Sequence, residues 1–116
     1  MVQFNINGIS LEAQYLYRYA LDMIDDGKTE VGLKYLRMAV SLAPRFCKAY
    51  NVIGNCLDEM GRYDEAIRSY EKALEIDPQH AEARFKRSMV RKKIGTVTRG
   101  QETGADFLSL ARFCGI

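Results

Sequence analysis

The chain has 116 residues, enough for one domain with a single hydrophobic core. Hydrophobic residues make up 47% and charged residues 28%, which is typical of a globular chain, and no apolar run approaches the roughly 18 residues of a membrane-spanning helix. Three widely spaced cysteines and one histidine argue against a disulfide framework and a metal site, so we expect no metal and no cofactor. The N-terminal residues lack the layout of a secretory signal, and we expect a cytoplasmic protein with no membrane partner.

Charge is unevenly distributed along the sequence. The net charge is +2, but residues 1–83 carry 13 acidic and 9 basic side chains, whereas residues 84–116 carry 2 acidic and 8 basic ones. A chain whose ends have opposite sign can bind an acidic partner with its basic end, or another copy of itself head to tail.

A period of 34 residues organises the sequence. This interval separates Gly27, Gly61 and Gly95, and it also separates Pro44 from Pro78. The chain has only two prolines and nine glycines, so composition alone does not explain the agreement. The period predicts a lead-in over residues 1–12, repeats over residues 13–46 and 47–80, and a divergent third unit over residues 81–116.

Each of the first two repeats is predicted to form two helices. Apolar residues at spacings of three and four predict helices over residues 11–26 and 29–42 in the first repeat. The second repeat predicts one helix that begins near Tyr50 and stops at Gly61, and another over residues 63–76.

Capping residues support these boundaries. Ser10 is a suitable N-cap, and Gly27 and Gly61 can adopt the left-handed conformation that ends a helix. No stretch alternates with period two for long enough to predict a strand, because residues 4–6 are too few.

Small residues recur where the two helices of a repeat must cross closely. Gly54 and Ala66 would let the helices of the second repeat touch, with Tyr50 and Tyr70 in the flanking space. The first repeat has the same arrangement 34 residues earlier. Ala20 and Gly32 are its small residues, and Leu16 and Leu36 are its large apolar residues. A single pair of helices buries too little surface on its own, so stability must come from stacked neighbours.

At these residues the sequence resembles the tetratricopeptide repeat family. The second repeat carries AYNVIGNCL at residues 49–57 and GRYDEAI at residues 61–67, followed by Tyr70, Ala73 and Pro78. The first repeat is a moderate match, and the resemblance covers residues 13–80. It implies an all-α fold, an α-solenoid of antiparallel helical hairpins wound into a right-handed superhelix. It also implies that the first helix of each pair lines a concave groove that binds partner proteins, and that the chain is not an enzyme.

The third unit departs from this pattern after Gly95. Sliding the register by four residues aligns Gly104, Leu108 and Ala111 with the small, large and small residues of the earlier second helices. We therefore infer a one-turn insertion within residues 96–103, a candidate loop or hinge. A C-terminal capping helix over residues 105–113 would follow.

The resemblance also implies the positions that face the groove. These partner-binding positions are Tyr17, Leu21, Lys48, Asn51, Asn55, Phe85, Met89 and Lys92. Asn51 and Asn55 are one helical turn apart and suit an extended peptide backbone, and Phe85 with Met89 suits an adaptable apolar pocket. The alternative is that the four apolar and aromatic members are simply packed in the core.

Some members of the family bind the carboxylate of a chaperone tail through a charged clamp. Here Tyr17, Leu21, Val52 and Glu82 stand at four clamp positions, and only Lys86 keeps the expected charge. The sequence therefore argues against chaperone-tail binding.

The leading hypothesis is a protein-protein interaction module that holds an unidentified protein or peptide in its groove. One alternative is a homo-oligomer formed through apolar residues of the C-terminal helix: Phe107, Leu110, Phe113 and Ile116. A second alternative is binding of an anionic ligand or RNA by the basic run over residues 84–99. Phe85 is the single aromatic residue within that run, which disfavours nucleic acid. The run could equally be a solvated face, with Lys93 placed beside Glu59 by repeat stacking.

Catalysis has no support in the sequence. No glycine-rich phosphate loop, nucleophile–base pair or cluster of metal ligands is present. His80 follows Pro78 in a turn between repeats and is expected to be exposed.

Overall fold

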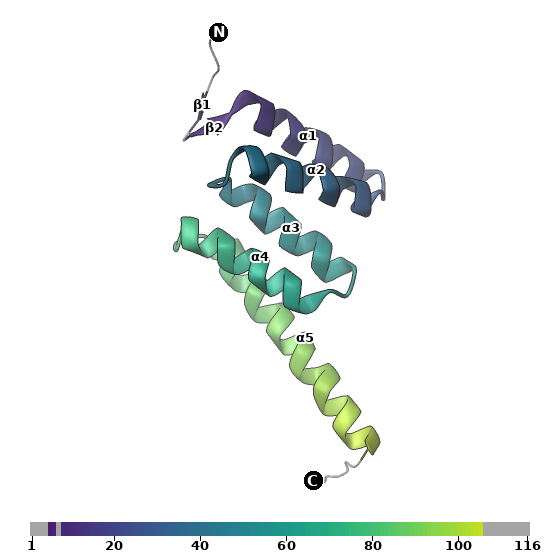
Figure 1. Cartoon of the computed structure of the whole chain (residues 1–116). Helices are drawn as coiled ribbons and strands as arrows, with labels where there is room; N and C mark the ends of the chain where they lie inside the picture. The colour runs from purple at the N-terminus through teal and green to yellow at the C-terminus, as the bar shows by residue number, and fades with distance from the viewer. Residues whose placement is uncertain (1–4, 7, 106–116) are drawn as a thin grey trace.

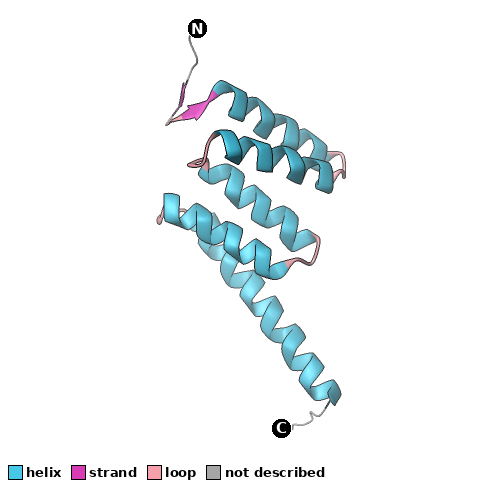
Figure 2. Ribbon diagram, viewed as in Figure 1, coloured by secondary structure: helices cyan, strands magenta, loops and turns pink. Residues whose placement is uncertain are grey.

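Two stacked helical hairpins and one long helix make up most of the molecule (Figure 1). The computed structural model describes the backbone of residues 5–6 and 8–105 and the side chains of residues 8–95. The helices are α1 (Leu11–Asp25), α2 (Thr29–Leu42), α3 (Cys47–Glu59), α4 (Tyr63–Ile76) and α5 (Ala81–Ala105). Helices α1 and α2 form one hairpin, α3 and α4 form the next, and α5 packs mainly on α4 (Figure 2). The predicted all-α solenoid of antiparallel hairpins is confirmed.

The predicted caps are present at the ends of the helices. Ser10 Oγ accepts a hydrogen bond from Ala13 N at 3.2 Å and so caps the start of α1. Gly27 and Gly61 have φ angles of +83° and +78°, in the left-handed region that favours glycine. The residue after each glycine donates a backbone hydrogen bond to the helix that has just ended. Lys28 N donates to the Met23 carbonyl at 2.8 Å, and Arg62 N donates to the Leu57 carbonyl of α3.

A short hairpin precedes α1, contrary to the expectation that the N-terminal lead-in contains no strand. β1 (Asn5–Ile6) pairs antiparallel with β2 (Ile9–Ser10), with Asn5 opposite Ser10 and Ile6 opposite Ile9. Gly8 lies between the strands with a φ angle of +80°. Backbone pairing across a turn makes this hairpin, and two-residue strands are too short to show a side-chain alternation in the sequence.

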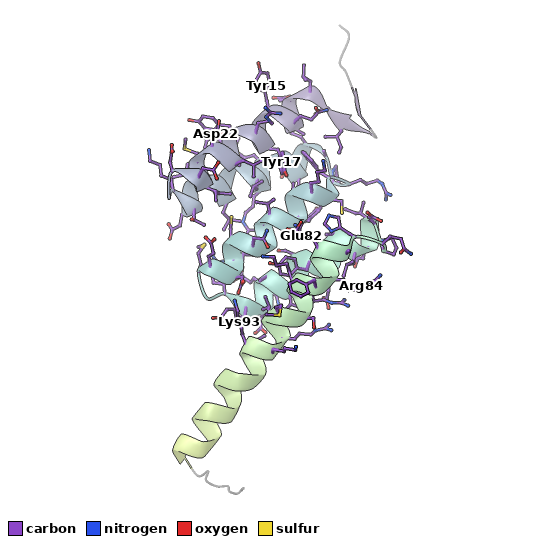
Figure 3. All side chains as sticks on the ribbon, turned by 180° about the vertical axis from the view of Figure 1, so that it is seen from behind. Tyr15, Tyr17, Asp22, Glu82, Arg84 and Lys93 are labelled. Atoms are coloured by element: carbon purple, nitrogen blue, oxygen red, sulfur yellow. The ribbon has the colours of Figure 1, made fainter. Side chains whose placement is uncertain are left out.

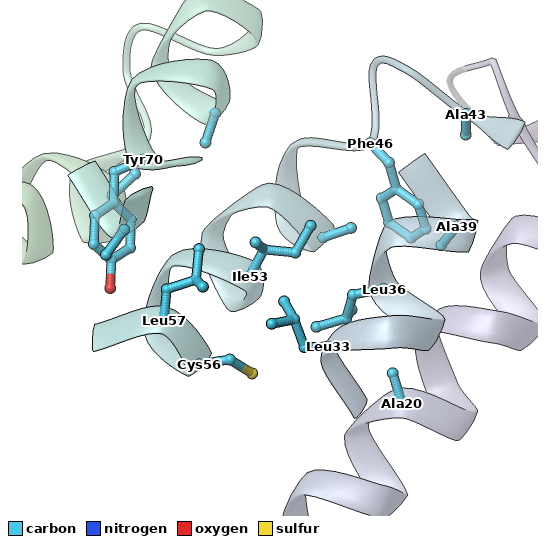
Figure 4. Close-up of a cluster of buried hydrophobic side chains, with 14 of the residues drawn as sticks. Ala20, Leu33, Leu36, Ala39, Ala43, Phe46, Ile53, Cys56, Leu57 and Tyr70 are labelled. Atoms are coloured by element: carbon cyan, nitrogen blue, oxygen red, sulfur yellow. The ribbon is translucent and has the colours of Figure 1, made fainter. Parts of the chain in front are cut away.

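The core lies between the two helices of each hairpin and between the hairpins (Figure 4). In the second hairpin, Gly54 faces the ring of Tyr70, and a Cβ at residue 54 would lie 2.5 Å from Tyr70 Cε1. In the first hairpin, a Cβ at Gly32 would lie 3.0 Å from the Ala20 carbonyl oxygen and still closer to the side chain of Ile24. The predicted close crossings at small residues are therefore present in both hairpins.

Helix α5 runs without interruption to Ala105, so residues 96–103, the candidate loop or hinge, are helical. Gly95 does not have the positive φ angle found at Gly27 and Gly61. A glycine inside a helix costs only about 1 kcal/mol relative to alanine. At Gly27 and Gly61, backbone hydrogen bonds cap the end of the helix. No such capping bonds form at Gly95, and the small cost of a glycine does not by itself end α5. The predicted capping helix and the proposed self-association residues Phe107, Leu110, Phe113 and Ile116 lie outside the described residues.

Apolar packing and ion pairs hold α5 against the second hairpin. Ala83 and Val90 are fully buried. Lys93 Nζ lies 2.8 Å from Asp58 Oδ1, and Arg91 lies 3.2 Å from Glu71 Oε2. The predicted partner of Lys93, Glu59, is wrong by one residue, because adjacent side chains diverge around a helix and Asp58 is the one that faces α5. In the part of the chain that the structure describes, no helix has both the length and the apolar character to cross a membrane.

We expect Gly54→Ala to lower the free energy of unfolding by about 1–3 kcal/mol, because the new methyl group overlaps the Tyr70 ring. Urea denaturation followed by circular dichroism measures this change. The control is Gly95→Ala, where a Cβ would meet no atom within 4 Å and helix propensity predicts a gain of up to about 1 kcal/mol. Adding Tyr70→Leu to Gly54→Ala should recover part of the loss, since the first repeat already combines Ala20 with Leu36. Equal effects at residues 54 and 95 would contradict the close-crossing model.

Candidate functional site

The first helices of the repeats, α1 and α3, together with α5 form one face of the stack, which Figure 3 turns toward the viewer. We call it the groove face. Tyr17 on α1 and Glu82 on α5 both lie on this side in the figure. The charge of Glu82 contributes to raising the pKa of the Tyr17 hydroxyl, although burial of that hydroxyl is the larger cause. The groove face therefore brings residues of the first and last described helices within electrostatic reach.

A cleft of about 830 Å³ opens where α1, α3 and α5 begin. Its floor contains Tyr17 and Phe46, whose ring centroids are 4.9 Å apart. Its walls come from β2, α1, the start of α3, the end of α4 and the two turns between repeats: Ile9, Leu11, Gln14, Tyr15, Arg18, Arg45, Cys47, Lys48, Ile76, Asp77 and His80. Of the predicted groove positions, Tyr17 and Lys48 line this cleft. The 34-residue period could have indicated the rest, because it places both turns at the same end of the stack.

The two asparagines of α3 differ in their surroundings. The Asn55 Oδ1 atom accepts a hydrogen bond from the Tyr70 hydroxyl at 2.6 Å, so one lone pair of this oxygen is already engaged within the hairpin. Asn51 is 5% exposed, and its buried Oδ1 atom has no hydrogen-bond partner among the described residues. An unpaired buried carbonyl is costly, and most such atoms in folded proteins are paired.

The groove positions of α5 are open to solvent. Phe85 is 62% exposed and Met89 is 40% exposed, so the alternative that these two residues are packed core residues is wrong. Lys92 is also exposed. In α1, by contrast, Tyr17 and Leu21 are half-buried, and Tyr17 packs on Phe46.

Much of the basic run is engaged within the molecule. The Arg84 guanidinium donates to the Pro78 carbonyl, and Arg91 pairs with Glu71. Lys93 donates to both carboxylate oxygens of Asp58 and lies 5.8 Å from the centroid of the Tyr63 ring. The hydrogen bond to Asp58 raises the pKa of the Lys93 ammonium. These side chains dock α5 on the second hairpin.

His80 is half-buried rather than exposed, because its Nδ1 atom accepts a hydrogen bond from Ala83 N at 3.1 Å and so caps α5. No group of three potential metal ligands occurs among the residues that the structure describes.

A family model described as Tetratricopeptide repeat matches residues 47–80. Residues 47–80 are therefore a tetratricopeptide repeat. A curated relative, the small glutamine-rich tetratricopeptide repeat-containing protein 2 of Mycosarcoma maydis, is 35% identical over 54 residues. That match covers 47% of this repeat protein and 15% of the relative, so the chain corresponds to a small part of the relative's length.

Solved structures share the fold of this repeat protein. MamA matches with a TM-score of 0.71 and 25% identity over 72% of this chain and 49% of its own. The Yersinia enterocolitica type III secretion chaperone SycD, in complex with a peptide of the translocator YopD, matches with a TM-score of 0.69 and 26% identity. The SycD match covers 71% of this chain and 63% of that chain.

We expect Asn51→Leu to raise the free energy of unfolding of this repeat protein by about 1 kcal/mol, because it removes an unpaired buried carbonyl. Asn55→Leu is the matched control one turn away. It should lower stability by about 1–3 kcal/mol, since it leaves the Tyr70 hydroxyl without an acceptor. Thermal and urea unfolding of the two variants beside the parent chain measures both changes. A loss of stability in both variants would mean that the Asn51 side-chain carbonyl does have a hydrogen-bond partner.

Proposed function

We propose that this chain is a protein-interaction module that holds a segment of a partner protein on the groove face. The observation that carries the proposal is the solvent-exposed pair Phe85 and Met89, one helical turn apart on α5. An exposed aromatic ring beside a flexible thioether is a surface suited to apolar anchors of differing shape.

Polar groups on the same face suit a peptide backbone. The Asn55 carbonyl is already held by Tyr70, which leaves its amide nitrogen to donate to a peptide carbonyl. The exposed ammonium of Lys48 beside the cleft favours a partner segment that carries carboxylates.

The likeness to SycD supports a peptide as the partner, because that structure is a complex with a peptide of YopD. At 26% identity the likeness does not extend to a particular peptide. The partner is therefore defined by chemistry, as a segment with an apolar anchor flanked by acidic residues.

A binding role rather than a catalytic one fits the cysteines as well. Burial raises the pKa of the Cys56 thiol to about 11, so this thiol is not a nucleophile near neutral pH. Cys47 and Cys56 are free thiols, which favours a reducing compartment and a cytoplasmic location. Anion binding by the basic run is the weaker alternative, since Arg91 and Lys93 already pair with carboxylates.

Selection of peptides from a random phage-displayed library against the full chain tests the proposal, with affinities measured by fluorescence polarisation. Phe85→Ala and Met89→Ala should each weaken binding of the selected peptides by about tenfold, as expected when an anchor contact is truncated. The matched control is Met38→Ala on α2, where the methionine is 44% exposed but lies off the groove face. Equal weakening by Met38→Ala, or unchanged affinity in both α5 variants, would contradict binding on this face.

A further inference from the structure

Each repeat has a notch on its first helix, and the notch of α5 is open. Ala20 and Gly54 stand 34 residues apart and are buried beneath α2 and α4. Ser88 is the next residue at this interval, and it is exposed. Phe85 and Met89, which flank Ser88, are 62% and 40% exposed. We call Phe85, Ser88 and Met89 the α5 seat.

The seat is open because no second helix covers α5 within the described residues (Figure 1). In the first two repeats the chain turns at Gly27 or Gly61 and returns as α2 or α4. Helix α5 instead continues to Ala105, well past the end of the second hairpin. The described residues thus include the first helix of a third hairpin, and most of the segment that would supply its second helix lies beyond them.

The sequence after Gly104 matches the missing helix at the positions that would contact the seat. Gly104 corresponds to Gly32 and Ala66, and Leu108 corresponds to Leu36 and Tyr70. The residue on the first helix that faces this large side chain matches it in polarity in each repeat. In the second repeat the Tyr70 hydroxyl donates to Asn55. The equivalent pairs are apolar on both sides: Leu36 with Leu21 in the first repeat and Leu108 with Met89 in the third.

The chain cannot fill its own seat in this structure. Ala105 lies 17 residues beyond Ser88 on one continuous helix, which places it about 25 Å away at 1.5 Å per residue. Leu108 follows Ala105 by three residues, and three residues span at most about 11 Å. Leu108 therefore cannot return to the Ser88 of the same chain while α5 stays helical to Ala105.

We propose that two copies of this chain exchange their C-terminal segments, so that Leu108 of each copy packs on the α5 seat of the other. Each exchanged segment then completes the third hairpin of its partner. The exchanged helix would contact Met89, which the proposed peptide site also uses, so the two interactions share part of α5. Tyr17 and Leu21, the equivalents of Phe85 and Met89 in α1, stay half-buried with α2 in place, so an exchanged helix would leave the rest of the groove face accessible.

Light scattering after size-exclusion chromatography tests the exchange with two single variants of the full chain. Ser88→Arg blocks the seat and Leu108→Asp blocks the donor segment. The parent chain should be a dimer over a dilution series, and each variant alone should be a monomer. An equimolar mixture of the two variants should form a dimer again, because each mixed pair keeps one intact seat and one intact donor. Met38→Asp, on an exposed position of α2, is the control that should remain a dimer.

Circular dichroism of every variant shows whether α1 to α4 stay folded, and a variant that loses its helices is replaced by Ser88→Lys or Leu108→Asn. A monomeric parent chain would overturn the exchange and indicate a third hairpin closed within one chain. Single variants that dimerise like the parent, or a mixture that stays monomeric, would overturn it too. Peptide binding is measured separately by fluorescence polarisation, so failure of the exchange leaves the proposed function untouched.

Discussion

The fit between a notch on one helix and a large side chain on the next is the constraint on which the rest of the structure depends. At Gly54 this fit is so close that no Cβ can be accommodated beside the Tyr70 ring. The close approach buries the Tyr70 hydroxyl as well, and a buried hydroxyl needs a hydrogen-bond partner. Asn55 provides it from the groove face, so the packing inside the hairpin determines which atoms of Asn55 remain for a ligand.

The same repeat pattern explains which surfaces remain open at the ends of the stack. Ala49 and Ile53 are 0% and 3% exposed where the second repeat packs on the first. The residues 34 positions earlier are Tyr15 and Tyr19, and they are 73% and 48% exposed because no described helix precedes α1. Tyrosine suits such a position, since its ring can pack while its hydroxyl stays in water. Exposure of apolar residues in this molecule thus follows from position in the stack as much as from residue type.

The sequence predicts what depends on local spacing and misses what depends on distant contacts. The helices of both hairpins, the caps at Ser10 and Gly27 and the notch at Gly54 all follow from periodicity and residue size. The cleft was missed because its walls come from three separate turns and helices, and spacing within one helix does not indicate such a meeting. The continuation of α5 was missed because the threonines and glycine of residues 96–103 are poor helix formers in sequence. A glycine ends a helix only where capping bonds and a returning helix compensate for the turn.

The ion pairs that dock α5 on the second hairpin also limit which kinds of ligand this helix can bind. An exposed ion pair such as Lys93 with Asp58 contributes little to stability. These ion pairs still occupy the cations that a phosphate would need, so an anion must displace Asp58 and Glu71 before it can bind. An apolar side chain meets no such competition at Phe85 and Met89. The apolar pair that is open on the groove face therefore suits a polypeptide side chain, whereas Arg91 and Lys93 of the basic run are used to dock α5 on the second hairpin.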